Sequence, residues 1–306
     1  MTDALTDALR AVRMESSVFS RASLAAPWGV EAGTMTDGVF HAVVRGRAWA
    51  QLTGGGDPIA LERGDIVLMP FGHNHLMTDE VGRPARPIDQ LTTIDDRGMG
   101  QLVVEGDGAH TSLICGSVRF EPGGAHPLLS VLPPMIHARD VDGSLSTVIE
   151  RLIGMIASEV DEPVPGSETV IARLTDVLVI YVLREYIRRL EGGQAGWLGA
   201  LRDAEIGQAL GLMHRRPEAS WTAEALARAV GLSRSAFFSR FRAAVGETPS
   251  EYLTRWRVQV ACRILRDERV SVASVAARVG YQTEASFSNA FVRVMGVRPG
   301  AYKRAA

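Results

Sequence analysis

A short pattern of aromatic residues, glycine and proline occurs twice near the C-terminus, and the two copies are displaced by 50 positions. The repeated residues are Phe237, Phe241, Gly246, Pro249 and Tyr252, then Phe287, Phe291, Gly296, Pro299 and Tyr302. A repeat of this period is typical of two copies of one small structural unit. Each copy has the pattern of a helix, a turn with glycine and a second helix, which predicts two helix-turn-helix units.

The turn of the second unit contains one extra residue. The upstream positions are displaced by only 49: Ala227, Val230 and Gly231 recur as Ala276, Val279 and Gly280. A hydroxyl residue precedes each of the four expected helices, where its side chain can cap the first turn: Thr222, Ser233, Ser271 and Thr283. We expect residues 250–269 to form a helix that joins the two units and sets their separation.

The second helix of each unit is expected to bury one face and expose the other. The buried stripes are Phe237, Phe241 and Val245, then Phe287, Phe291 and Met295. The outward residues are Ser235, Phe238, Ser239 and Arg242, then Ala285, Ser286, Ser288, Asn289 and Arg293. Asparagine can pair with an adenine edge, and arginine binds guanine or phosphate, so these faces predict DNA readers. The alternative for them is an ordinary solvated surface.

Charge is distributed unevenly along the chain, although the net charge is only −2. From Asp203 onward, 16 Arg and Lys residues stand against 9 Asp and Glu residues, whereas the preceding part holds 17 against 26. A basic module joined to an acidic body is typical of a protein that binds a polyanion. We therefore expect the repeated units to bind double-stranded DNA.

The cysteine content and the apolar segments bear on the cellular compartment. Cys115 and Cys262 are the only cysteines and lie far apart, so we expect a reducing environment and no disulfide framework. No signal peptide is visible, and the most apolar stretch, residues 177–183, is much shorter than the roughly 20 residues that span a bilayer. We expect a cytoplasmic protein without membrane segments.

A change of periodicity divides the chain. Five segments that are rich in β-formers or alternate in polarity are separated by turn signals: 39–44, 48–52, 66–69, 101–104 and 112–120. Helical spacing follows over residues 145–156 and 168–190. The predicted fold class is α+β, with an N-terminal β jelly roll, a helical linker and an all-α C-terminal part. The expected domains are residues 1–143, 144–200 and 201–306, with a link over 192–197.

The helix expected over residues 168–190 is apolar on all sides in its middle, so it needs cover on two sides. A homodimer would provide one of these covers. Complete cover within one chain is an equal alternative.

The duplicated region resembles the AraC/XylS family of bacterial transcription regulators. The resemblance rests on the repeat, on residues 221–227 and on the two turn motifs at Gly231 and Gly280. It implies sequence-specific promoter binding by both units and contact with RNA polymerase, usually for activation. The base-contacting positions that it implies are Ser235, Phe238, Ser239, Glu284, Ala285, Ser286, Ser288 and Asn289.

The strand-rich region resembles the cupin jelly roll. Gly64, Pro70, Gly72 and His75 have the spacing of the second cupin motif, and sensor domains of this kind are attached to some AraC-type regulators. The first motif of metal-binding cupins needs a second histidine, which is missing after His41, so we expect no metal and no other cofactor.

The histidines and the cysteine of the strand-rich region are candidates for a sensing role. His41, His73 and His75 could orient a small molecule inside the barrel, with satisfied rim histidines as the alternative. Cys115 lies in an apolar strand context, which favours an inert buried thiol, and a redox-sensing thiol is the alternative.

These observations predict a DNA-binding transcription regulator, an activator by its family resemblance, whose cupin-like domain senses a small molecule or a stress signal. They predict no catalytic residues. Two further hypotheses are a metal-dependent cupin enzyme and a helical module that binds proteins. The missing ligand set argues against the enzyme, and the basic charge of the repeats argues against the protein-binding module.

Overall fold

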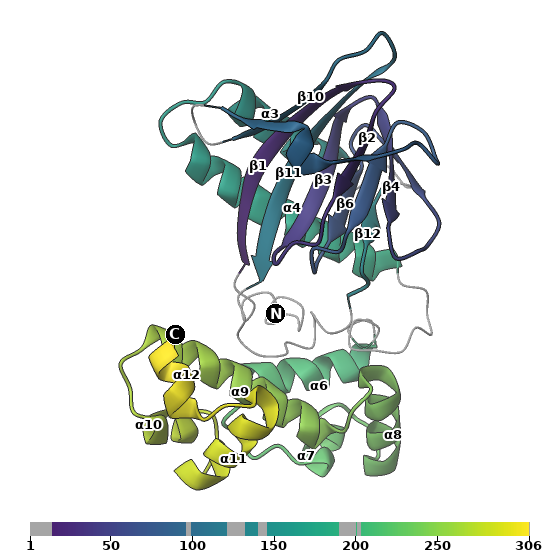
Figure 1. The fold of residues 1–306 in the computed structure, drawn as a ribbon. Helices are drawn as coiled ribbons and strands as arrows, with labels where there is room; N and C mark the ends of the chain where they lie inside the picture. The colour runs from purple at the N-terminus through teal and green to yellow at the C-terminus, as the bar shows by residue number, and fades with distance from the viewer. Residues whose placement is uncertain are drawn as a thin grey trace. The chain divides into compact units, whose positions relative to one another are not determined.

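Alternating apolar residues form two facing β-sheets in the N-terminal half of the chain. A computed structural model describes residues 14–95, 99–120, 132–139, 146–189, 200 and 203–305, which fall into two compact units. One unit holds residues 14–120 and 132–189, and the other holds the C-terminal helices. All the described strands belong to the first unit and the second is helical, which confirms the predicted α+β class (Figure 1).

The larger sheet has seven strands and the smaller has five. The larger sheet runs in the order β12 (Ile136–Ala138), β6 (Ile66–Met69), β3 (Gly38–Arg45), β11 (His110–Phe120), β1 (Met14–Ala25), β10 (Gly100–Val104) and β9 (Thr92–Ile94). The smaller runs in the order β5 (Ile59–Glu62), β4 (Arg47–Leu52), β7 (His75–Thr78), β2 (Gly29–Ala32) and β8 (Arg86–Pro87), and a short 3-10 helix, η1 (Ile88–Gln90), follows β8. Strand β1 pairs antiparallel with β11 and parallel with β10.

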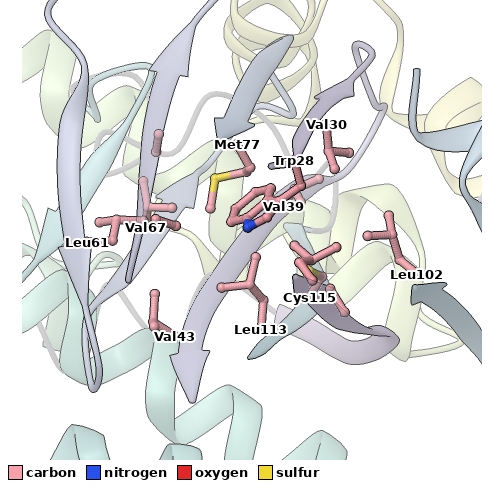
Figure 2. Close-up of a cluster of buried hydrophobic side chains, with 14 of the residues drawn as sticks. Trp28, Val30, Val39, Val43, Leu61, Val67, Met77, Leu102, Leu113 and Cys115 are labelled. Carbon is pink, nitrogen blue, oxygen red and sulfur yellow. The ribbon is translucent and has the colours of Figure 1, made fainter. Parts of the chain in front are cut away.

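The core of this unit lies between the two sheets. Figure 2 shows Val39, Leu113 and Cys115 from the larger sheet packed with Val30 and Met77 from the smaller. Successive side chains of a strand point to opposite faces, so every second residue of β3 and β11 enters this core. The remaining residues of these strands face outward.

Two helices cover the outer face of the larger sheet. Helix α3 (Ser146–Asp161) packs on α4 (Ser167–Arg189) and on β3, and α4 also packs on β1 and β12. Phe40 and Ile114 are fully buried on this face. Helices α3 and α4 thus lie in the same compact unit as the strands, whereas the link expected over residues 192–197 falls outside the described residues.

Seven helices form the described C-terminal part. They are α6 (Ala204–Arg215), α7 (Ala223–Ala229), α8 (Arg234–Val245), α9 (Pro249–Asp267), α10 (Val272–Arg278), α11 (Glu284–Met295) and α12 (Pro299–Ala305). Within this part, the first helix-turn-helix unit pairs α7 with α8, the second helix-turn-helix unit pairs α10 with α11, and α9 connects the two. All four expected caps form, because each hydroxyl accepts a backbone N–H of the first helical turn.

The five expected strand segments and both expected helices before residue 190 are present with small shifts at their ends. The strands without a counterpart among the five segments are β1, β2, β5, β7, β8, β9 and β12. No helix in the described part of the chain combines the length and the apolar character required to cross a membrane.

Candidate nucleic-acid interface

Helices α8 and α11 are built as copies of each other. Each has 12 residues, begins at a hydroxyl cap (Ser233 or Thr283) and ends at a glycine in the left-handed conformation. The backbone φ is 87° at Gly246 and 72° at Gly296, values that residues with a Cβ atom rarely adopt. The repeated glycines therefore define where each helix stops.

The buried faces of α8 and α11 also match. Phe241 packs edge-on against Tyr252 with ring centroids 5.9 Å apart, and Phe291 packs in the same way against Tyr302 at 5.6 Å. The predicted stripes are buried, except that Met295 is only half-buried at the edge of its cluster. These aromatic contacts hold each recognition helix on its own core, so its opposite face is turned to solvent.

The predicted DNA-reading residues lie on the solvent faces. Those that are exposed are Ser235, Phe238, Ser239, Arg242, Glu284, Ala285, Ser286, Asn289 and Arg293. Ser288 is half-buried and is less accessible than the prediction assumed. The Ser286 hydroxyl donates to the Thr283 carbonyl and accepts from the Thr283 hydroxyl, so it is engaged in the helix cap. Phe238 is 40% exposed, which is unusual for a ring of this size in a small helical domain.

The two recognition helices share one open groove. Its volume is about 880 Å³, and its lining includes Arg242 of α8 and Arg293 of α11. Arg242 lies on the same helical face as Ser239, and Arg293 on the same face as Asn289, by their spacing. The C-terminal ends of the two outward faces therefore border the same hollow.

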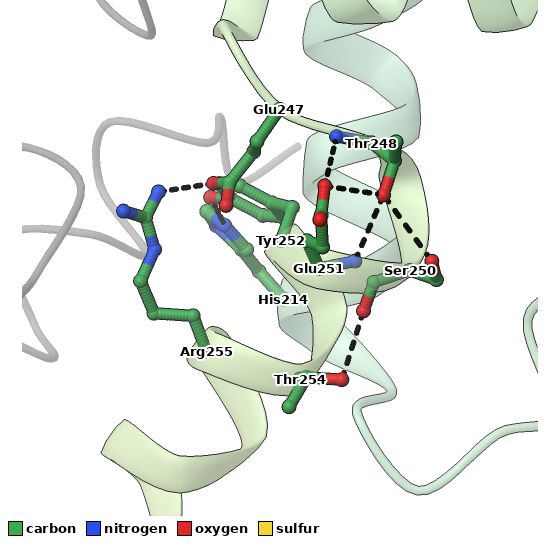
Figure 3. Close-up of polar contacts among 8 residues, drawn as sticks. All are labelled: His214, Glu247, Thr248, Ser250, Glu251, Tyr252, Thr254 and Arg255. Atoms are coloured by element: carbon green, nitrogen blue, oxygen red, sulfur yellow. Dashed lines mark hydrogen bonds and ion pairs between the residues drawn. The ribbon is translucent and has the colours of Figure 1, made fainter. Parts of the chain in front are cut away.

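The start of α9 forms the floor of this groove. The Thr248 hydroxyl accepts the Glu251 backbone N–H, and the Glu251 carboxylate accepts the Thr248 N–H at 2.9 Å, a complete capping box (Figure 3). Hydrogen bonds from Thr248, together with the nearby charges of Arg242 and Arg293, lower the pKa of Glu251. The second carboxylate of the groove, Glu247, pairs with Arg255. Neither Arg242 nor Arg293 has an ion-pair partner within the described residues.

One arginine of α8 is already paired with carboxylates of the protein. Arg240 binds Asp203 at 2.8 Å and Glu205 at 3.0 Å, both at the start of α6. Hydrogen bonding to Asp203 and its charge raise the pKa of Arg240. The sequence did not indicate this role, because the partners are far away along the chain.

The candidate sensing residues of the N-terminal unit separate into an interior group and a surface residue. His41 and His75 are buried between the sheets, whereas the His73 side chain is exposed. The Nδ1 atom of His41 lies 2.9 Å from the Cys115 Sγ atom, and the Nε2 atoms of His41 and His75 are 2.7 Å apart. The Nδ1 atom of His75 lies 2.7 Å from the His73 carbonyl oxygen.

These contacts fix the positions of the protons. Burial lowers the pKa of His41 well below its usual value and also lowers the pKa of His75, so both rings are neutral at pH 7. A carbonyl can only accept, hence His75 donates from Nδ1 and accepts at Nε2. His41 then donates from Nε2, and its Nδ1 accepts the Cys115 thiol proton. The result is a directed chain of hydrogen bonds that joins the two sheets.

This arrangement bears on metal binding and on redox sensing. His41 presents opposite ring nitrogens to Cys115 and His75, so the three side chains do not converge on one point as metal ligands would. In the described part of the chain no group of three or more potential ligands could hold a metal ion. Burial raises the pKa of Cys115 to about 12, and such a thiol lacks the thiolate character of reactive cysteines.

Comparison with known proteins agrees with this organisation. Residues 3–188 match a family described as Cupin, and residues 226–305 match one described as Helix-turn-helix domain. A putative AraC-like transcription regulator of Streptomyces lividans is 31% identical over 302 residues, covering 99% of this chain and 98% of the relative. The RCS-specific HTH-type transcriptional activator RclR of Escherichia coli is 26% identical over 304 residues, covering 98% of this chain and 97% of the relative.

Among solved structures, the DNA-binding domain of AdpA in complex with a target DNA is 31% identical. The match covers 32% of this chain and 88% of the AdpA domain, with a TM-score of 0.31. The similar full-length proteins are transcription regulators and not enzymes, as the sequence predicted. With its Cupin match, its two capped helix-turn-helix units and a full-length relative above 30% identity, the chain belongs to the AraC-like family of DNA-binding transcription regulators.

Proposed function

We propose that this regulator binds promoter DNA by placing α8 and α11 in successive major grooves on one side of the duplex. The supporting observation is the shared groove, which Arg242 of α8 and Arg293 of α11 both line. Successive major grooves lie roughly 34 Å apart along one side of DNA. Two recognition helices whose C-terminal arginines line one hollow support a binding mode in which both face the same side of the duplex.

Different residues then supply different parts of the recognition. Asn289 pairs with an adenine edge, and the exposed Phe238 ring packs on a thymine methyl group. Arg242 and Arg293 bind phosphates, and the small side chains of Ser235 and Ser239 let the backbone of α8 approach the base edges. The remaining predicted positions, Glu284, Ala285, Ser286 and Ser288, line the start of α11 and contribute mainly shape.

The proposed regulatory outcome is activation through contact with RNA polymerase. The relative RclR is named a transcriptional activator and is similar over nearly its whole length. A regulator of this kind works beside the chromosome, so we also propose a cytoplasmic location.

The N-terminal unit is proposed to receive a small molecule or a stress signal. His41, His75 and Cys115 place three polar side chains inside an apolar core, and a few polar groups in apolar surroundings typically orient a bound ligand. A signal that disrupts the His41–His75 contact would weaken the connection between the sheets. It would shift the population of DNA-competent molecules, which is how a sensor domain controls a binding domain.

A homodimer through α4 is the proposed assembly. The buried residues of α4 pack on the sheet and on α3, but Val170 and Val177 are 42% and 40% exposed and lie two helical turns apart. Sedimentation at micromolar concentration tests the dimer. Val170→Glu with Val177→Glu should give monomers, and a monomeric parent protein would exclude the dimer.

The DNA-binding mode is tested by selecting genomic fragments bound by the full-length protein and footprinting them. We expect two protected major grooves on one side of the duplex, one helical turn apart. An Asn289→Ala variant should relax the sequence preference in one of the two. Protection confined to a single groove in every selected fragment would contradict the proposal.

A further inference from the structure

A single arginine of the connecting helix contacts both helix-turn-helix units. Arg257 of α9 donates from Nε to the Pro217 carbonyl at 2.6 Å and from Nη2 to the Ala219 carbonyl at 2.9 Å. Both acceptors belong to the loop between α6 and α7, and α6 packs on both helices of the first unit, α7 and α8. The planar guanidinium group can satisfy two such acceptors at once, whereas a lysine ammonium group presents a single nitrogen.

The same guanidinium group lies over an aromatic ring of the second unit. Its central carbon is 5.4 Å from the ring centroid of Tyr281, within the range of a cation–π contact. Tyr281 lies in the turn between α10 and α11, and its ring packs edge-on against Phe287 at 5.6 Å. Arg257 therefore links the loop before α7 to the ring that packs on Phe287, a buried residue of the second recognition helix.

The backbone at Gly280 brings the turn of the second unit directly against this loop. Gly280 has a φ of 86°, and a Cβ atom at this position would lie 2.6 Å from the Glu218 carbonyl oxygen. The equivalent glycine of the first unit, Gly231, has a φ of 73° but no neighbour within 4 Å of such a Cβ atom. Only the second copy of the repeat thus uses its glycine for a close contact between units.

From these contacts we propose that Arg257 is a positioning residue, which fixes the separation of α8 and α11 and hence the spacing of the two DNA half-sites. The proposal rests on the DNA-binding mode above. If α9 were the single connection between the two helix-turn-helix units, rotation about its ends would change the distance between the recognition helices. The contacts of Arg257, Gly280 and Tyr281 with residues 217–219 form a second connection, so the two units cannot rotate independently.

Arg257→Ala tests this in the full-length protein, with fluorescence anisotropy on duplexes derived from a selected operator. One series changes the spacing between half-sites one base pair at a time, and another retains a single half-site. We expect the variant to lose about tenfold in affinity at the preferred spacing, because the two half-sites no longer bind as one linked pair. Its affinity for a single half-site should stay unchanged, and its preference for one spacing should flatten.

Three further variants separate positioning from folding. Gly280→Ala should reproduce the loss of spacing preference, whereas Gly231→Ala places the same side chain at a left-handed position without the contact and should keep the preference. Arg263→Ala removes an exposed arginine from the same helix and serves as the charge control. If Arg257→Ala does not fold, Arg257→Lys is used, because it keeps the charge and loses the paired hydrogen bonds.

Two results would overturn the positioning role. One is a spacing preference that remains as sharp in the Arg257 variants as in the parent protein, and the other is an equal loss of affinity for single half-sites. Failure of the parent protein to bind any duplex would instead contradict the DNA-binding mode itself.

Discussion

The Nε2 atoms of His41 and His75 lie 2.7 Å apart between the two sheets of the N-terminal unit, and one ring donates its proton to the other. The contact connects β3 of the larger sheet to β7 of the smaller. It is lost when both rings are protonated, since two imidazolium groups would place donors and positive charges face to face.

We therefore expect the full-length protein to lose stability as the pH falls below about 6.5, the ordinary pKa of histidine. Burial lowers the pKa of His41 and His75, so the unfolded chain binds protons in this range that the folded chain does not. The stability is fully present above that pH and declines toward the folded pKa values. Thermal unfolding as a function of pH measures it. His41→Gln should flatten the dependence and His73→Gln should not; an unchanged profile for His41→Gln would contradict the account.

Cys115 is expected to resist alkylation in the folded protein. Burial raises the pKa of both Cys115 and Cys262 to about 12, so neither supplies a thiolate near neutral pH. Iodoacetamide labelling followed by mass spectrometry should modify both only after denaturation. Rapid labelling of Cys115 in the native protein would instead support the redox-sensing alternative.

Replacement of Cys115 also tests its role as a hydrogen-bond donor. Cys115→Ala leaves the His41 Nδ1 atom buried without its donor, which should lower the free energy of unfolding by about 1–3 kcal/mol. Cys115→Ser keeps a donor and should be less damaging. Equal stability of the alanine variant and the parent, measured by denaturant unfolding, would show that the contact contributes nothing.

The groove arginines should contribute to the salt dependence of DNA binding. Arg242→Ala or Arg293→Ala should each reduce the slope of log K against log salt concentration by about 0.9, as expected for one lost phosphate contact. Arg240→Ala is the matched control on the same helix, because Asp203 and Glu205 already hold that side chain. A slope change for Arg240→Ala as large as for Arg242→Ala would place the phosphate contact elsewhere.

The capping box at the start of α9 should stabilise the C-terminal part. Thr248→Ala removes the hydroxyl that accepts the Glu251 N–H and should lower the free energy of unfolding by about 1 kcal/mol. Thr254→Ala is the control, because that hydroxyl donates to the Ser250 carbonyl within the same helix and contacts Tyr281, but takes no part in the cap. Chemical denaturation compares the two, and equal effects would argue against a special role of the cap.

The local features of the recognition helices could be predicted from the sequence. The caps at Ser233 and Thr283 and the stops at Gly246 and Gly296 depend only on neighbouring residues, and all of them form. The buried aromatic stripes follow from helical spacing in the same way. What the spacing could not show is that the Ser286 hydroxyl would be used by its own helix cap.

The contacts that join distant segments could not be predicted. His41, His75 and Cys115 become neighbours only through the register of β3 with β11 and the facing of the two sheets. Arg257 binds backbone carbonyls, which carry no sequence signature. Strand β1 was not among the expected segments, although it pairs along its whole length with β11.

The position of β1 has a consequence for how the protein is made. This strand lies in the interior of the larger sheet, where Ser20 pairs with Gly100 on one side and with Cys115 on the other. Both partners come much later in the sequence. During synthesis β1 leaves the ribosome long before either partner exists, so both of its edges stay open while most of the N-terminal half is being translated. Open strand edges are where nascent chains aggregate or recruit chaperones, and yield in cells should therefore depend on chaperone supply more than on the final stability.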